Sequence, residues 1–354
     1  MTVEILPRPA DAIARFLQMA GPVLAPVISV LGALAITAIL LDALGVNPLF
    51  AYESMVLGAV GTAQSLSDTL AKTVPITLIA LGVALSFRCG LWNVGGEGQF
   101  YAGAIGAALA GILIDAPALL LIPLEVAAGM LAGALVALVP AVLKAKFNTN
   151  EILVTLMLNF VPHLLALYLI AGPFAHDLAA KTVDINRGGE LPWLIIGNLR
   201  IHAGIVFALA AVMAMQFLIS RTTFGYKVRA IGANPDAARA VGINVTRTQF
   251  ASFLIAGALG GLSGMIQVAA LHHNLLEGMS PGFGFTSVVA ALLGRLHPLG
   301  VLAGSFGFAA LLVGGDSMQR TARIESATVF VIEGLILLFL LSGRVIGRER
   351  AQIV

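Results

Sequence analysis

Residues 116–143 read APALLLIPLEVAAGMLAGALVALVPAVL and contain one ionisable side chain, that of Glu125. This stretch is longer than the about 20 apolar residues that a helix needs to cross a bilayer. The rest of the chain has the same character, because 59% of the 354 residues are hydrophobic, 11% are charged and the mean hydropathy is +0.98. Soluble domains carry about 25% charged residues. The composition therefore excludes a disordered chain, a fibrous repeat and most soluble enzymes, and it predicts a membrane protein.

Similar apolar runs, bounded by charged residues, recur on both sides of this stretch. We predict an all-α, polytopic membrane protein, with about ten transmembrane or re-entrant helices in a single domain over residues 1–354. Residues 278–293 begin among glycines and a proline, and both this run and 98–114 either cross the membrane or re-enter it. The predicted elements are 16–41, 73–87, 98–114, 116–143, 152–175, 201–220, 248–276, 278–293, 296–315 and 326–342.

The distribution of lysine and arginine predicts the orientation, because these residues concentrate in cytoplasmic loops. If the N-terminus is cytoplasmic and all ten elements cross, fourteen of the 20 lysines and arginines lie on the cytoplasmic side. Both termini are then cytoplasmic, including an N-terminal segment over 1–20 that is not a clear signal peptide. Loop 172–199 lies outside the cell, where it either packs over the outer mouth of the protein or forms a solvated linker. Loop 221–247 lies inside the cell.

The cytoplasmic loop contains five basic residues and one acidic residue, Asp236. Asn234 followed by Pro235 is typical of a helix N-cap and first helical position, and Gly242 is typical of a helix end. We therefore predict a short helix over about 235–241. A capped helix between two membrane spans indicates a docking surface. A basic loop retained by topology alone would explain the charge but not the caps.

No motif for enzymatic chemistry occurs in the sequence. The phosphate-binding loop, the dinucleotide fingerprint and the zinc-protease and serine-hydrolase motifs are all missing, so we expect no catalytic residue and no cofactor bound by this chain. Of the six histidines only His272 and His273 are adjacent, and adjacent side chains on a helix diverge by about 100°, so we expect no metal site. The net charge of +2 offers no broad basic field for nucleic acid, and the single cysteine, Cys89, cannot form an internal disulfide.

A first polar cluster lies in LWNVGGEGQ at residues 91–99, at the entrance to an apolar run. It combines three glycines with the side chains of Asn93, Glu97 and Gln99. Irregular backbone at membrane depth survives only where it is buried in protein or lines a cavity, and in transporters such segments form substrate sites. The cluster is therefore either part of a substrate pathway or a cytoplasmic turn whose polar groups face water.

A second polar cluster begins at residues 148–151, which read NTNE. Asn150 or Thr149 is a suitable N-cap for the following helix, and an acidic residue next to it suits the positive helix end. Thr155 and Asn159 follow four residues apart and share one helix face, which predicts either hydrogen bonds between helices or contact with a solute.

Two acidic residues, Glu125 and Glu333, stand alone within apolar stretches. Each either faces the protein or the membrane interface, or forms an ion-coupling site.

The polar segments together resemble the bacterial ABC-importer permeases of the nucleoside and simple-sugar type, within the branched-chain amino-acid and ribose permease superfamily. The resemblance covers roughly residues 70–343, and Trp92 stands where that family more often has phenylalanine. The similar stretches are RCGLWNVGGEGQ at 88–99, Asn150-Glu151 with TLMLN at 155–159, RAIGANP at 229–235 within 225–242, and GFGF at 282–285 through ALLGRLHPLG at 291–300.

The resemblance implies a permease subunit of an ATP-driven importer in the bacterial inner membrane. Such permeases pair with a second permease subunit, either a different chain or a copy of the same one. A cytoplasmic ATPase supplies ATP hydrolysis and an external binding protein delivers the solute. The resemblance assigns ATPase coupling to a segment similar to the EAA-xxx-G pattern, namely Pro235, Asp236, Ala237, Ala238 and Gly242.

The GGEGQ form at residues 95–99 resembles nucleoside-type members more than ribose or amino-acid types. Hydroxyl groups and base edges of a nucleoside would suit polar side chains in the pathway, for which the candidates are Asn93, Glu97, Gln99, Thr155 and Asn159. The alternatives are a simple-sugar permease, or an ion-coupled secondary transporter that uses Glu125 or Glu333.

Overall fold

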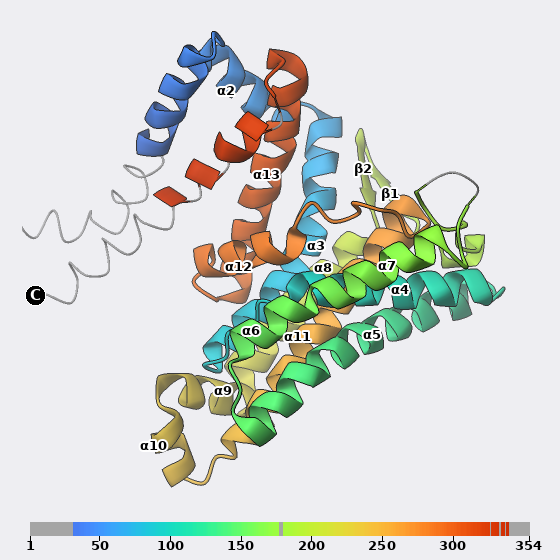
Figure 1. Cartoon of the computed structure of the whole chain (residues 1–354), viewed down its shortest axis with the longest axis vertical. Coiled ribbons are helices and arrows are strands. Elements are labelled where there is room, and N and C mark those ends of the chain that lie inside the picture. Colours follow the sequence, from blue (N-terminus) through green and yellow to red (C-terminus); the bar gives the residue numbers. More distant parts are fainter. Residues whose placement is uncertain (1–30, 177–179, 326, 333, 337, 340–354) are drawn as a thin grey trace, which may run out of the picture. The chain divides into compact units, whose positions relative to one another are not determined.

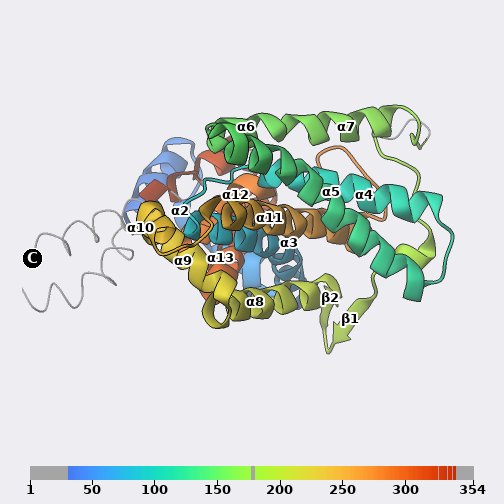
Figure 2. The same cartoon turned by 90° about the horizontal axis from the view of Figure 1, so that it is seen from below.

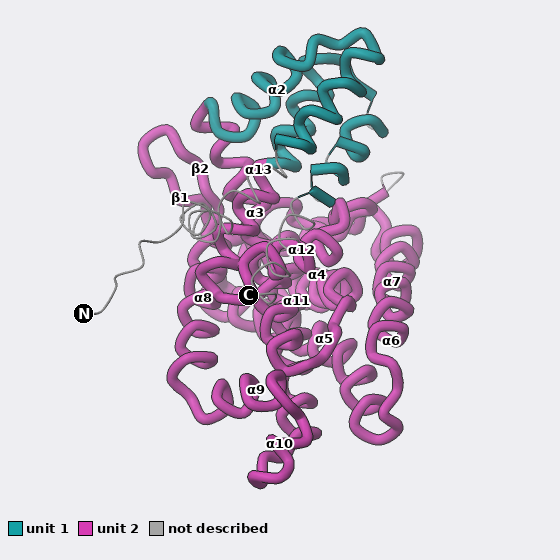
Figure 3. The backbone as a smooth tube through the Cα atoms, turned by 90° about the vertical axis from the view of Figure 1, so that its left-hand side faces the viewer, with its two compact units in different colours: residues 1–61, 311–354 teal, residues 62–310 magenta. Residues whose placement is uncertain are grey.

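The computed structural model describes residues 31–176, 180–325, 327–332, 334–336 and 338–339. The chain forms two compact units, one made of residues 1–61 and 311–354 and the other of residues 62–310. Figure 3 shows the two units in different colours. The predicted cytoplasmic segment 1–20 and the predicted position of Glu333 lie outside the described residues.

The larger unit is built almost entirely of helices (Figure 1). Loop 172–202 interrupts them with a two-stranded antiparallel hairpin, in which β1 (Trp193–Ile196) pairs with β2 (Leu199–His202). The helices are α3 (Ala63–Arg88), α4 (Gly96–Leu113), α5 (Ala118–Phe147), α6 (Glu151–Leu158), α7 (Phe160–Ala171), α8 (Gly204–Arg221), α9 (Thr223–Ala233), α10 (Pro235–Ala240), α11 (Val245–Gln267), α12 (Phe283–Leu293) and α13 (Pro298–Ala322), the last of which continues into the smaller unit.

Asparagine side chains set the starts of several helices. Asn150 accepts a hydrogen bond from the backbone N–H of Ile152 at 3.0 Å, which confirms the predicted cap of α6. Asn244 caps α11 in the same way through the N–H of Arg247 at 2.9 Å. Such caps satisfy backbone donors that have no partner within their own helix.

Helices α4, α5 and α11 pack together through glycines (Figure 2). A Cβ atom on Gly103 of α4 would lie 2.1 Å from the carbonyl oxygen of Gly261 on α11, and one on Gly261 would lie 2.1 Å from the carbonyl oxygen of Gly129 on α5. Any larger side chain would overlap backbone atoms. These small residues therefore allow the close helix contacts that are common inside membranes.

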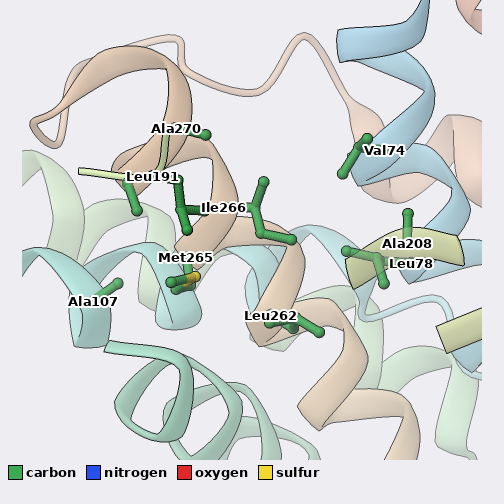
Figure 4. Packing of buried hydrophobic residues seen from close by; sticks show 10 residues of the cluster. Val74, Leu78, Ala107, Leu191, Ala208, Leu262, Met265, Ile266 and Ala270 are labelled. Atoms are coloured by element: carbon green, nitrogen blue, oxygen red, sulfur yellow. The ribbon is translucent and has the colours of Figure 1, made fainter. Parts of the chain in front are cut away.

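A hydrophobic core surrounds the end of α11 that is remote from α10 (Figure 4). Leu262, Met265 and Ile266 of α11 share one buried cluster there with Val74 and Leu78 of α3. The core also includes Ala107, Leu191, Ala208, Ala269 and Ala270. The surrounding helices are held around α11, which is buried over most of its length.

The smaller unit contains α2 (Pro48–Val56), the π-helical turn Leu57–Gly61 and a helical segment, Leu31–Ala43. Its core brings Leu41 and Ala51 together with Met318 from the end of α13 and Ile332. The hydroxyl groups of Thr37 and Tyr52 also lie 2.5 Å apart, which links the helical segment to α2.

The prediction of a mostly helical membrane protein is confirmed. Six helices among the described residues are long and apolar enough to cross a membrane, and the predicted number of about ten is not confirmed. The predicted span 73–87 is the second part of α3, which starts earlier because Thr62 caps it through the N–H of Ser65. Helices α2 and α9 were not predicted.

Two of the predicted apolar runs do not form single helices that cross the membrane. The span 152–175 is interrupted between α6 and α7, although Figure 2 shows the two helices running end to end. Pro162 has no N–H to donate to the carbonyl of Leu158, and this weakens the helix at that point. Helix α12 is 11 residues long, about 16 Å, which is too short to cross a core of about 30 Å and favours the re-entrant alternative for 278–293.

Candidate substrate pathway and coupling surface

The chain breaks its helical path at the motif 91–99. Helix α3 ends at Arg88, and Gly90 has a φ of +73°, a left-handed conformation that favours glycine. The N–H of Leu91 then bonds back to the carbonyl of Ser86 at 3.0 Å. This is the hydrogen bond of a Schellman helix end, and it turns the chain into an extended segment before α4 begins at Gly96.

Asn93 and Gln99 are buried together beside this segment, with exposed fractions of 1% and 2%. The Oδ1 atom of Asn93 accepts hydrogen bonds from the N–H of Gly95 at 3.1 Å and from Nε2 of Gln99 at 3.2 Å. The Nδ2 atom of Asn93 is buried and has no hydrogen-bond partner within the described part of the chain. It is thus a buried donor available to a group that this chain does not supply.

Asn159 and Thr155 hold the same segment from the opposite side. Asn159 lies at the break between α6 and α7, accepts from the N–H of Gly98 at 2.8 Å and donates to the carbonyl of Val94 at 3.0 Å. The hydroxyl of Thr155 accepts from the N–H of Val94 at 3.3 Å and donates to the carbonyl of Glu151 at 2.7 Å. Backbone groups left over by the broken helix are therefore bound by side chains from α6 and its end.

The fifth predicted pathway residue, Glu97, points to a different helix. Its Oε2 atom accepts a hydrogen bond from the N–H of Gly284 at 2.7 Å, and the carboxylate also bonds to the side chain of Ser280. A Cβ atom on Gly284 would lie 2.2 Å from the backbone nitrogen of Glu97, so the two backbone segments approach too closely for a larger residue at Gly284. The carboxylate thus lies at the positive N-terminal end of α12.

The structure brings all five predicted residues into one assembly, which we call the polar cluster: Asn93, Glu97, Gln99, Thr155 and Asn159 around the backbone of 92–98. Asn93, Thr155 and Asn159 bind that backbone directly, whereas Gln99 binds Asn93 and Glu97 binds Gly284. Glu151 stands in the first turn of α6 as predicted, and it also makes two further contacts. Its carboxylate forms an ion pair with Lys144 at 3.0 Å and accepts from the N–H of Trp92 at 3.4 Å. Trp92 itself is 53% exposed and packs on Phe87.

The predicted short helix is present as α10. Asn234 accepts hydrogen bonds from the N–H groups of Asp236 at 2.9 Å and Ala237 at 3.1 Å, which confirms it as the N-cap. Gly242 has a φ of +83° and follows the end of the helix as predicted. Ala238 is buried, whereas Pro235, Asp236 and Ala237 are exposed. The helix therefore offers one polar, exposed face at the end of the larger unit that lies farthest from the β-hairpin (Figures 1 and 3).

Helix α9, which the sequence analysis missed, connects α10 to the rest of the unit. The Arg229 guanidinium donates to the carbonyl of Ile219 at the end of α8. A Cβ atom on Gly232 would lie 2.0 Å from the carbonyl oxygen of Arg88, so α9 touches the end of α3. The side chain of Gln249 also donates to the carbonyl of Cys89 at 3.4 Å. Gly232 of α9 and Gln249 of α11 therefore contact the turn that leads into the polar cluster.

Glu125 is fully buried on α5, so it faces the protein and not the membrane interface. Neither carboxylate oxygen has a hydrogen-bond partner among the described residues. Its Oε1 atom occupies space that Cβ atoms on Gly111 and Gly189 would fill, at 2.4 and 2.1 Å. Glu125 lies outside the polar cluster.

Comparison with known proteins gives consistent matches. A family model described as a branched-chain amino acid transport system permease component matches residues 65–341. The whole chain is similar to a glucose ABC transporter permease protein of Haloferax volcanii, at 35% identity over 95% of that protein. A nucleoside ABC transporter permease protein of Lactococcus lactis is 32% identical over 90% of each chain, and a guanosine ABC transporter permease protein of Bacillus subtilis is 31% identical over 90% of this chain and 93% of the relative.

Proposed function

The chain belongs to the ABC permease family described as the branched-chain amino acid transport system permease component, and from this premise we propose that it imports a nucleoside. It is a non-enzymatic, multi-pass subunit of the cytoplasmic membrane, and ATP hydrolysis belongs to a separate subunit. Membership in this family removes the alternative of an ion-coupled secondary transporter.

The similarity to relatives named for nucleosides and guanosine supports a nucleoside as the solute. The relative named for glucose has 35% identity and supports a simple sugar as the second candidate. Both solutes present ring hydroxyl groups, whereas a nucleobase adds flat edges with donors and acceptors. The distinction is therefore chemical and can be tested directly.

The polar cluster is our proposed part of the solute pathway. The observation that supports it is the buried, unpaired Nδ2 atom of Asn93 beside an extended segment that interrupts two helices. Irregular backbone of this kind is tolerated in membranes where it is buried in protein or lines a cavity. Because Thr155, Asn159 and Glu97 already bind backbone groups, they position the segment, and Asn93 is left to contact the solute.

Helix α10, with Pro235, Asp236, Ala237, Ala238 and Gly242, is our proposed docking surface for the ATPase. We place it on the cytoplasmic side because loop 221–247 carries five basic residues against one acidic residue, the charge bias of cytoplasmic loops. The contacts of Gly232 with Arg88, and of Gln249 with Cys89, support a route from α10 to the polar cluster. A movement of α9 and α10 would displace the turn at Gly90 and the segment that follows it.

The complete transporter in this proposal contains this chain, a second permease subunit, an ATPase and an external binding protein. The nucleoside relatives include two different permeases from Lactococcus lactis and two from Bacillus subtilis, which supports a second permease of different sequence. A homodimer remains the alternative arrangement. Sequential affinity purification of the complex, with a different tag on each chain, distinguishes the two.

The coupling proposal is tested with Ala237→Arg in the complete transporter in vesicles. The exposed side chain of Ala237 lies at the proposed ATPase contact, so we expect uptake per ATP hydrolysed to fall severalfold while the thermal stability of the permease stays unchanged. The matched control is Ala180→Arg, which places the same side chain on an exposed alanine in loop 172–202. Normal coupling in Ala237→Arg, or an equal loss in Ala180→Arg, would overturn the assignment.

The solute is tested by competition for uptake in the same vesicles. We expect unlabelled guanosine and other nucleosides to suppress uptake of a labelled nucleoside, and glucose or ribose to leave it unchanged. Strong uptake of labelled glucose without nucleoside uptake would replace the nucleoside with the simple-sugar alternative.

A further inference from the structure

The β-hairpin presents exposed apolar side chains at its tip. Ile195 and Ile196 are 70% and 64% exposed, immediately before the two-residue turn at Gly197 and Asn198. The hairpin is fixed to α3, because the N–H of Arg200 donates to the hydroxyl of Ser67 at 3.1 Å. The hairpin thus exposes two large apolar side chains. Contact of such side chains with water is unfavourable, so their exposure indicates a partner or a membrane.

The hairpin continues the surface of α8 that faces outward. Helix α8 begins at Gly204, directly after β2, and its exposed side chains recur every three or four residues. With 18 residues α8 is about 27 Å long, close to the about 30 Å of a hydrocarbon core. The hairpin therefore lies at the edge of that core, at the end of α8 opposite α9 and α10 (Figure 3). The outward stripe of α8 consists of Val206, Leu209, Met213 and Phe217.

A groove of about 180 Å³ opens between this hairpin and the start of α3. Arg200 lines it on the hairpin side, with its guanidinium carbon 5.8 Å from the centre of the Trp193 ring. Asp68 of α3 lines the other side, where its carboxylate accepts from Gln64 at 2.9 Å. A cation and an anion thus flank one groove beside an aromatic ring, at the level where tryptophan commonly meets lipid headgroups.

We infer that this groove binds the headgroup of a zwitterionic phospholipid that carries a primary amine, such as phosphatidylethanolamine. The phosphate lies against Arg200 and the ammonium group lies against Asp68. The acyl chains run along Ile195, which shares a hairpin face with Arg200, and along the outward stripe of α8. Opposite charges in the groove match the opposite charges of this headgroup. The site is separate from the polar cluster and from α10, so it goes beyond the proposed transport function.

The test uses the fluorescence of Trp193 in the full-length chain with Trp92→Phe, since the sequence has only two tryptophans. The purified protein is titrated in detergent with phosphatidylethanolamine, phosphatidylcholine or phosphatidylglycerol, each carrying a nitroxide near the headgroup. We expect half-maximal quenching at a severalfold lower concentration of labelled phosphatidylethanolamine than of the other two lipids. Trp92, observed alone in a Trp193→Phe variant, should show no such preference.

Three variants distinguish the proposed contacts. Asp68→Asn should abolish the preference for phosphatidylethanolamine, whereas Arg200→Gln should weaken quenching by all three lipids. Glu190→Gln, which removes an exposed acidic residue elsewhere in loop 172–202, is the matched control and should leave the preference intact. Retained thermal stability shows that each variant is folded. Ile195→Ser with Ile196→Ser provides a second set of variants, in which the charges of the groove are not altered.

The inference is overturned by any of three results. The first is equal quenching by all lipids in the Trp92→Phe protein. The second is a preference that survives Asp68→Asn. The third is loss of lipid quenching when the second permease or the external binding protein is added, which would assign the hairpin to a protein interface.

Discussion

The polar cluster and helix α10 both depend on asparagine side chains that bind backbone N–H groups, but their surroundings differ. Asn159 is 5% exposed and binds two backbone groups of a segment more than sixty residues away in sequence. Asn234 is exposed and binds the two N–H groups that follow it directly. A buried polar group without a partner loses much more free energy than an exposed one, because water cannot replace the partner. The same residue type therefore maintains the membrane fold in one region and shapes the proposed docking surface in the other.

The largest expected effect is that of Asn159→Leu. The substitution leaves the N–H of Gly98 and the carbonyl of Val94 without their partner, at a cost of about 1–3 kcal/mol for each buried group, or about 2–6 kcal/mol together. We expect a clear drop in the thermal unfolding temperature of the detergent-purified chain. The same change at the exposed position, Asn234→Leu, should lower that temperature far less. Equal shifts in the two variants would show that burial does not separate the two regions.

A smaller effect on stability, but a large one on transport, is expected for Asn234→Ala. Loss of a helix N-cap costs about 1 kcal/mol, and here the loss is confined to α10. We expect the unfolding temperature of the chain to stay nearly constant while ATP-dependent uptake by the complete transporter decreases. Asn234→Ser keeps a capping side chain and should retain uptake. If uptake is normal in both variants, the conformation of α10 does not matter for coupling.

The smallest effect concerns loop 172–202, which lies in neither region. The side chain of Asn274 donates to Asp184 at 2.8 Å, and this hydrogen bond, together with Lys181, holds the pKa of the Asp184 carboxyl below its usual value. The stabilisation is complete above the unfolded pKa of about 4 and is lost as the pH falls through the lower folded pKa.

This pH dependence is measured by hydrogen exchange at the N–H of Ile185, which bonds to the carbonyl of His273 beside Asn274. After correction for the intrinsic pH dependence of amide exchange, we expect less protection of this N–H below pH of about 4 than near pH of about 6. Asp184→Asn should remove most of the difference. An unchanged difference in that variant would assign the pH dependence to another group. Exchange in the polar cluster should be unaffected, because the effect is confined to loop 172–202.

Several local features followed from residue patterns alone. Asn234-Pro235 and Gly242 predicted α10 because capping and left-handed glycine ends depend on neighbouring residues only. The apolar runs on either side of 91–99 predicted a non-helical polar segment between two helices, and α3 and α4 do end and begin there. The resemblance of these segments to the permease family, over roughly 70–343, agrees with the family match over 65–341.

Other features could not be predicted because they depend on which helix lies next to which. The break at Asn159 needs Pro162 and also the backbone of Gly98, and no local pattern places those two segments together. The contact of Gly232 with Arg88, and the bond from the Arg88 side chain to the carbonyl of Leu296, join parts of the chain separated by more than a hundred residues. Helix α9 was missed because its charged residues made it look like a loop.

The sequence by itself determined that this protein is a helical membrane permease, where the capped helix α10 begins, and which polar residues stand at a helix break. Those properties follow from hydrophobicity, capping and backbone preference, which act over a few residues. Only the tertiary structure decided that Glu97 binds the start of α12, that Thr155 and Asn159 hold the 92–98 backbone, and that α9 touches the turn before it. These contacts arise because unpaired backbone groups in a buried environment must find partners, and those partners come from distant helices brought close by glycine packing.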